Sequence, residues 1–142
     1  MSEPLDVAFG ALNPDSGERF QRLRAELGVA AFGMNLIVLQ PGQRGRIHSH
    51  DVQEEVFVVL EGELSLGLEG EERTLGVGDV VRVGPNVRRQ LVNRGSDRVV
   101  LLALGGSGDH VGRDGRAWES WDEDGPGRPP ADVPLPEDVP LR

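Results

Sequence analysis

Short apolar segments separated by turn residues dominate the middle of the chain. Residues 34–39, 56–60, 80–83 and 99–104 are rich in valine, leucine and isoleucine, and residues 64–68 alternate between leucine and small residues. Short runs of this kind, bounded by glycine and proline, are typical of β-strands. The pattern therefore predicts β-structure throughout residues 31–104.

Glycines mark the turns between these segments. Gly62, Gly70 and Gly78 recur at eight-residue intervals. Because glycine accepts a positive φ, Glu61-Gly62 and Glu69-Gly70 predict tight hairpin turns. Many short strands, with a turn every eight to twelve residues or so, indicate a β-sandwich or a β-barrel. We therefore predict an all-β fold of antiparallel strands.

The first 30 residues differ from this central region. Phe20, Leu23 and Leu27 recur at helical spacing, and Gly28 follows them. This spacing favours a short helix that ends near Gly28, with an edge strand as the alternative. We interpret residues 1–30 as an N-terminal extension of the barrel.

Residues 105–142 form a third region, which is acidic and rich in glycine and proline. Six of the ten prolines lie in residues 126–140, and nine acidic residues stand against four arginines in residues 105–142. Such a composition is typical of a solvated tail with little secondary structure. Trp118 and Trp121 nevertheless predict that the tail is anchored along the barrel or along a partner subunit.

Charge and composition narrow the partners and the location. A net charge of −9 disfavours nucleic acid, because a phosphate backbone attracts a basic surface. No apolar run reaches the roughly 18–20 residues that cross a membrane, and no signal peptide is visible. The sequence has no cysteine, so disulfides and thiolate chemistry are excluded. We expect a cytoplasmic protein that binds neither nucleic acid nor membranes.

The candidate chemistry lies in the segment His48-Ser49-His50 and in Glu55. In a strand, residues two apart face the same side, so the two imidazoles point into one space. Glu54 and Glu55 face opposite sides if extended, so only one of them can join the histidines. Two imidazoles and one carboxylate form a three-point site for a divalent transition metal, similar to the arrangement in non-haem iron oxygenases.

The spacing of these residues resembles the first conserved motif of the cupin superfamily. Gly42, His48, His50, Glu55 and Gly62 stand at all of its defining positions. The resemblance covers roughly residues 30–104 and implies a double-stranded β-helix, or jelly-roll barrel, of eight or more antiparallel strands. It also implies that His48, His50 and Glu55 are metal ligands inside the barrel.

The second cupin motif, from Gly78-Asp79 to Asn93, departs from the family pattern. Arg89 occupies the place of the family's last metal-binding histidine, and an arginine that stays protonated is no metal ligand. Three alternatives follow. The metal stays on three ligands while Arg89 binds an anionic group of the substrate, or Arg89 replaces the metal and pairs with Glu55, or Arg89 points outward. His110 is a further candidate for the missing ligand.

The resemblance implies a small cupin that binds a small polar or anionic metabolite beside a divalent metal, with Fe, Mn, Ni, Co and Zn all compatible. If the protein is an enzyme, it implies a metal-dependent oxygenase or isomerase. The competing hypothesis is a metal-free ligand-binding or sensing cupin, and a third is an interaction protein whose barrel carries the tail. No nucleotide cofactor is expected, since no phosphate-binding glycine loop is present. Cupins of this size generally resemble homodimers.

Overall fold

The structure is a computed structural model that describes residues 4–106 and 114–140. These residues form ten strands, one short α-helix and one 3₁₀ turn. The elements are β1 (Phe20–Arg22), α1 (Leu23–Leu27), β2 (Gly33–Leu39), β3 (Ile47–His50), β4 (Glu54–Glu61), β5 (Leu64–Leu68), β6 (Glu71–Leu75), β7 (Val80–Val83), β8 (Arg89–Val92), β9 (Val99–Gly106), β10 (Gly115–Trp118) and η1 (Pro130–Asp132).

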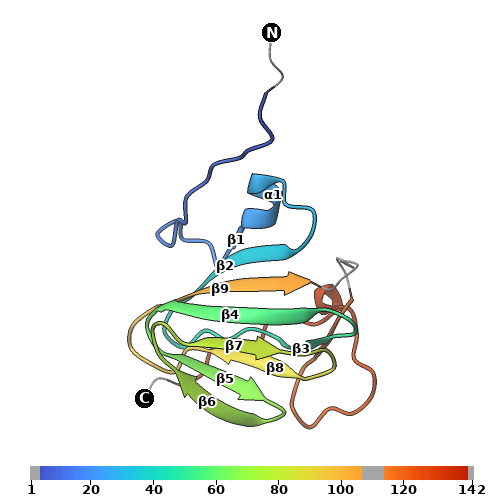
Figure 1. Cartoon of the computed structure of the whole chain (residues 1–142). Helices are drawn as coiled ribbons and strands as arrows, with labels where there is room; N and C mark the ends of the chain where they lie inside the picture. The colour runs from blue at the N-terminus through green and yellow to red at the C-terminus, as the bar shows by residue number, and fades with distance from the viewer. Residues whose placement is uncertain (1–3, 107–113, 141–142) are drawn as a thin grey trace.

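The strands form two five-stranded sheets in which every pairing is antiparallel (Figure 1). One sheet has the order β1-β2-β9-β4-β7 and the other has the order β10-β3-β8-β5-β6. Neighbours in each sheet are mostly distant in sequence, which is typical of a jelly roll. The predicted all-β antiparallel jelly-roll barrel is confirmed.

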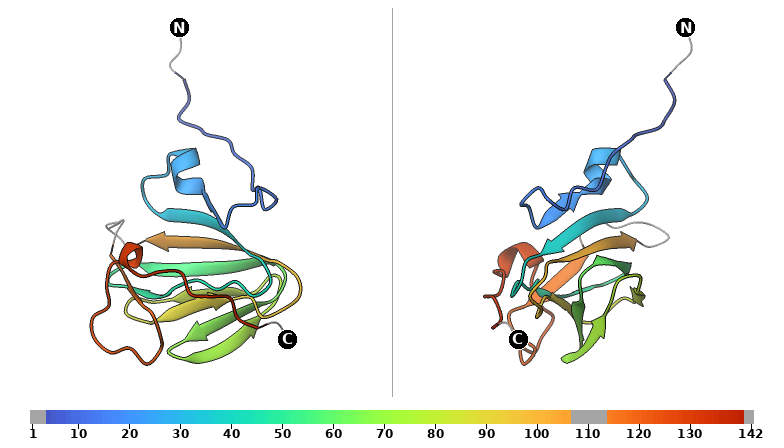
Figure 2. Two further views of the ribbon diagram at one scale, coloured as in Figure 1. Left: turned by 180° about the vertical axis from the view of Figure 1, so that it is seen from behind. Right: turned by 90° about the vertical axis from the view of Figure 1, so that its left-hand side faces the viewer.

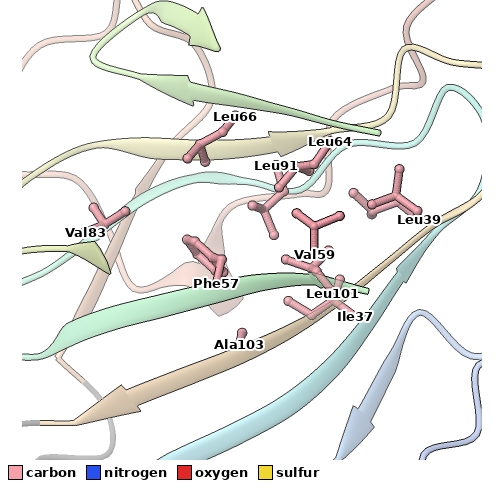
Figure 3. Close-up of a cluster of buried hydrophobic side chains, with 11 residues drawn as sticks. Ile37, Leu39, Phe57, Val59, Leu64, Leu66, Val83, Leu91, Leu101 and Ala103 are labelled. Carbon is pink, nitrogen blue, oxygen red and sulfur yellow. The ribbon is translucent and has the colours of Figure 1, made fainter. Parts of the chain in front are cut away.

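The main core lies between the two sheets (Figure 3). Alternate residues of facing strands supply it: Ile37, Leu39, Phe57, Val59, Leu64, Leu66, Val83, Leu91, Val99, Leu101 and Ala103. On β2 the residues between these positions, Leu36 and Val38, pack on the other face against Leu23 of α1. Both faces of β2 are therefore buried, and this explains why its sequence is apolar without alternation.

Both N-terminal alternatives occur in the structure, one after the other. The edge strand β1 pairs with β2, and α1 follows directly and ends at Gly28, which has a φ of 71°. Within the described residues, no helix is long and apolar enough to cross a membrane.

The two predicted hairpin turns have different outcomes. Glu69-Gly70 connects β5 and β6, which pair with each other, so this hairpin is confirmed. Glu61-Gly62 connects β4 and β5, which belong to different sheets, so the hairpin prediction is wrong there. At this corner Gly62 has a φ of 79°, and an added Cβ would collide with the backbone carbonyl of Arg98. The turn requires this glycine, but a glycine in the sequence does not indicate whether the chain returns to the same sheet or changes sheet.

The C-terminal segment lies against the outside of the barrel (Figure 2). Strand β10 extends the second sheet by pairing with β3. The Trp118 ring is buried, its Nε1 donates to the carbonyl of Gly125 at 3.1 Å, and the Arg88 guanidinium lies 3.9 Å from its centroid. The Trp121 ring packs on Gly67, where an added Cβ would collide with it. Both tryptophans thus anchor this segment, while region boundaries at residues 30 and 104 stay a prediction.

Candidate functional site

The three predicted metal ligands converge at one place, although they come from both sheets. His48 and His50 lie on β3, and Glu55 lies on β4 of the facing sheet. One potential ligand atom from each residue lies within 4.8 Å of the other two. His48 Nε2 is 3.6 Å from Glu55 Oε1, and His50 Nε2 is 3.9 Å from Glu55 Oε2. Glu54 instead pairs with Arg82 on the exposed face, as the strand alternation requires.

Both imidazoles are held through Nδ1, on the side away from the glutamate. His48 Nδ1 lies 3.2 Å from the backbone carbonyl oxygen of Arg46, and His50 Nδ1 lies 2.9 Å from Asp114 Oδ1. Carbonyl and carboxylate oxygens only accept, so each Nδ1 carries the hydrogen in these contacts. In the neutral rings the Nε2 lone pairs therefore face Glu55.

Asp114 is a residue of this site that the sequence reasoning missed. Its carboxylate accepts hydrogen bonds from the backbone N–H groups of Val52 and Gln53, from the Gln53 side-chain amide and from His50. Burial by itself raises the pKa of Asp114, but these four donors outweigh it and hold the pKa far below its usual range. Asp114 is therefore an anion that fixes the turn between β3 and β4 and orients His50.

The cluster fits a metal ion better than it fits an empty site. Glu55 Oε1 is buried and has no hydrogen-bond partner among the described residues. Burial raises the pKa of Glu55, but the His48 imidazole and then the charges of His50 and Arg89 lower it below its usual value. When both rings are neutral, the Glu55 carboxylate and the two Nε2 lone pairs face one another, and this arrangement could hold a cation. Imidazole and carboxylate together suit a divalent transition metal.

Arg89 lies behind Glu55 and has no exposed surface. Its Cα is the register partner of His48 across β3 and β8, so both side chains face inward. Arg89 Nε lies 3.8 Å from Glu55 Oε1, and its Nη2 donates to the carbonyl of Gly84 at 3.2 Å. This excludes the alternative in which Arg89 points outward.

The Arg89 guanidinium is only partly satisfied by its neighbours. Nε and Nη1 have no hydrogen-bond partner among the described residues. Burial lowers the pKa of the Arg89 guanidinium, although the negative charge of Glu55 raises it in part. A closed Arg–Glu pair has N–O distances of roughly 2.7–2.9 Å, which is much shorter than the separation here. Arg89 also lines neither of the two cavities at the site. Its role in substrate binding stays a prediction.

Two cavities reach the cluster. One, of about 220 Å³, lies within the barrel and is lined by all three candidate ligands. The other, of about 750 Å³, lies between α1 and the ends of the strands and is lined by His50 and Glu55. Small molecules can therefore approach the cluster from inside the barrel and from its α1 side. His110 lies outside the described residues.

Comparisons with known proteins agree with this geometry. A family model described as Cupin domain matches residues 35–105, half of the chain. A Cupin 2 conserved barrel domain protein from Salinispora arenicola is 30% identical, with 74% of this chain and 87% of that chain covered and a TM-score of 0.57. A cupin protein from Bacteroides fragilis, 18% identical, shares the fold with a TM-score of 0.65 over 87% of this chain and 99% of that one.

A sugar phosphate isomerase of the cupin superfamily from Silicibacter pomeroyi is 27% identical, with a TM-score of 0.63 over 71% of this chain. The chain spans 65% of the length of that isomerase, which is less than two thirds. A search of curated proteins finds no match.

Proposed function

The chain belongs to the cupin superfamily, and on that premise we propose that its barrel binds a small polar or anionic metabolite in the cytoplasm, beside a divalent metal ion held by His48, His50 and Glu55. The observation that carries this proposal is the set of three acceptor groups, which face one another from two sheets and have no donor between them among residues 4–106 and 114–140. The 220 Å³ cavity beside them supplies the space for the metabolite.

The residues of the site have separate roles in this proposal. His48 and His50 bind the metal through Nε2, while Glu55 binds it through its carboxylate and neutralises part of its charge. The bound metal supplies Lewis-acid polarisation of a ligand oxygen. Apolar side chains of the barrel, such as Phe57 and Leu91, exclude water from the ligand. Of the two reaction classes, isomerase and oxygenase, the Silicibacter isomerase supports the first.

The test is the metal content of purified, untagged protein, measured by mass spectrometry for Fe, Mn, Ni, Co and Zn. The variants are His48→Ala, Glu55→Gln and, as the matched control, Glu54→Gln. Glu54 adjoins Glu55 but faces the surface. We expect near-stoichiometric metal in the wild type and in the control, and its loss in the other two. A wild-type protein that stays metal-free after reconstitution would contradict the proposal.

One observation favours the metal-free alternative. Arg89 is a buried cation, and Glu55, 3.8 Å away, is its ion-pair partner among the described residues. In this second function Arg89 takes the place of the metal charge, and the barrel stores or senses its ligand without metal chemistry. A protein free of metal, stabilised by a small ligand, would then be the expected result of the same experiment.

The N-terminal segment supports a homodimer. It extends away from the barrel, with the Leu5, Val7 and Phe9 side chains exposed to 85%, 61% and 94% (Figure 1). Three alternating apolar side chains form a surface that a second copy can cover. Sedimentation of the full chain should show a dimer, and Phe9→Ser should weaken it. Val77→Ser, which changes an exposed apolar residue outside the N-terminal segment, should leave the dimer unchanged. A wild-type monomer at the same concentration would contradict the homodimer.

A further inference from the structure

Two arginines line the barrel cavity together with the candidate ligands. Arg46 directly precedes β3, so Arg46, His48 and His50 alternate on the same side of the chain, and all three line the cavity. Arg19 directly precedes β1 of the other sheet and is fixed there, because its backbone carbonyl accepts from Val38 N–H at 2.8 Å. Each sheet thus contributes one guanidinium to one cavity.

These guanidinium groups retain free donors. Arg46 Nε donates to the carbonyl of Val133 at 2.6 Å, and Arg19 Nη1 donates to the carbonyl of Arg44 at 3.1 Å. Within the described residues, the remaining nitrogens of both groups make no hydrogen bond and neither group forms an ion pair. Other arginines, such as Arg94 and Arg98, are paired with carboxylates.

Charged neighbours of Arg19 act on its guanidinium group. Burial lowers the pKa of Arg19 most, the charge of Asp138 opposes this effect, and the charge of Arg46 then adds a smaller lowering. Two half-buried cations line one cavity without an ion pair among the described residues, so an anion bound between them would be stabilised by both charges. Guanidinium groups match the geometry of carboxylate and phosphate oxygens.

The cavity limits the size of such an anion. Its volume of about 220 Å³ is below the range of typical drug-sized pockets. Arg46 and His48 are two residues apart, which is about 6–7 Å along an extended chain. A ligand with an oxyanion near Arg46 therefore needs only a few bonds to reach the candidate metal centre.

We propose that Arg19 and Arg46 bind the carboxylate or phosphate group of a small acid or phosphate ester, while the rest of that molecule points toward His48, His50 and Glu55. This inference rests on the proposed function of the barrel as a ligand site, and it deepens that function by assigning the anion to these two arginines. It places the anionic group on the cavity wall, whereas Arg89 lies outside that wall.

The test is an NMR titration of the full-length protein, as purified, with inorganic phosphate and separately with acetate, with metal content measured on the same samples. The variants are Arg46→Gln and Arg19→Gln. The controls remove one charge elsewhere: Arg73→Gln on the exposed face of β6, and Arg24→Gln in the outer cavity. Arg46→Lys is added in case Arg46→Gln, which loses the contact with Val133, is unstable.

We expect the apparent Kd of the preferred anion to rise about tenfold or more in Arg46→Gln and Arg19→Gln, to rise less in Arg46→Lys, and to change less than about twofold in both controls. The probe that binds the wild type with the lower apparent Kd identifies the anionic group as phosphate or carboxylate. No binding of either probe to the wild type, unchanged affinity in both cavity variants, or a loss only in Arg24→Gln would overturn the assignment.

The inference and the metal proposal fail independently. If the wild type contains no metal but its anion affinity still depends on Arg19 and Arg46, the anion site stands and the metal centre falls. If metal is present and depends on His48, but anion affinity is the same in all arginine variants, the metal centre stands and the anion site falls.

Discussion

His50 Nδ1 lies 2.9 Å from Asp114 Oδ1, and the two residues are 64 positions apart in the sequence. The carboxylate fixes the hydrogen of the ring on Nδ1 and leaves the Nε2 lone pair facing Glu55. A histidine that binds a metal generally donates its second ring hydrogen to such an acceptor, which sets its orientation and basicity. Asp114 is thus a positioning residue for the candidate metal centre.

Asp114→Asn should weaken metal binding about 10- to 100-fold, since the amide loses the charge and one of the two accepting oxygens. It should also reduce the free energy of unfolding by about 1–3 kcal/mol, because the N–H groups of Val52 and Gln53 share the lost acceptor. Competition with a metal chelator measures the affinity, and denaturant unfolding measures the stability. Asp124→Asn, an exposed change in the same segment, is the control. Wild-type metal affinity in Asp114→Asn would show that His50 needs no support.

Arg89→His should tighten metal binding, because it restores an imidazole at the fourth position and removes a cation beside Glu55. Arg89→Met removes the cation without adding a ligand, so comparison of the two variants separates these effects. We expect both to bind metal more strongly than the wild type, with the histidine variant strongest in isothermal titration. If both variants are instead unfolded even when metal is supplied, Arg89 is a structural partner of Glu55 and the metal-free function is favoured.

Gly62→Ala should destabilise the barrel by about 3 kcal/mol, because Gly62 combines a φ of 79° with a close backbone neighbour, the carbonyl of Arg98. Gly70→Ala is its matched comparison, since Gly70 has a φ of 87° but no atom within 4 Å of an added Cβ. Only the backbone conformation costs stability there, about 1 kcal/mol. Urea unfolding measures both values. Equal losses in the two variants would show that the contact with Arg98 is unimportant.

The sequence predicted the barrel and the converging ligands because both depend on local patterns. Strand alternation puts His48 and His50 on one face and separates Glu55 from Glu54, and the structure agrees on both points. Which sheet each strand joins depends on pairings between distant segments. The local pattern at Gly62 therefore predicts a hairpin, whereas the chain changes sheet there.

The supporting residues of the site could not be predicted for the same reason. Asp114 is one of nine acidic residues in a segment whose composition resembles a solvated tail, and nothing in its spacing from His50 marks it. Arg19 lies in the N-terminal extension, and only the pairing of β1 with β2 brings it to the cavity. The position of Arg46 is predictable from the sequence, because it precedes His48 by two residues and therefore faces the same side of an extended chain.

The pairing of β10 with β3 also has a consequence for how the protein is made. A ribosome completes His48, His50 and Glu55 well before it reaches Asp114, so until then His50 lacks the acceptor for its Nδ1 hydrogen. A chain that stopped before residue 114 would encode every candidate ligand and yet lack the carboxylate that orients His50. Full metal affinity would then arise only late in translation, when Asp114 and the adjoining strand β10 emerge and β10 pairs with β3.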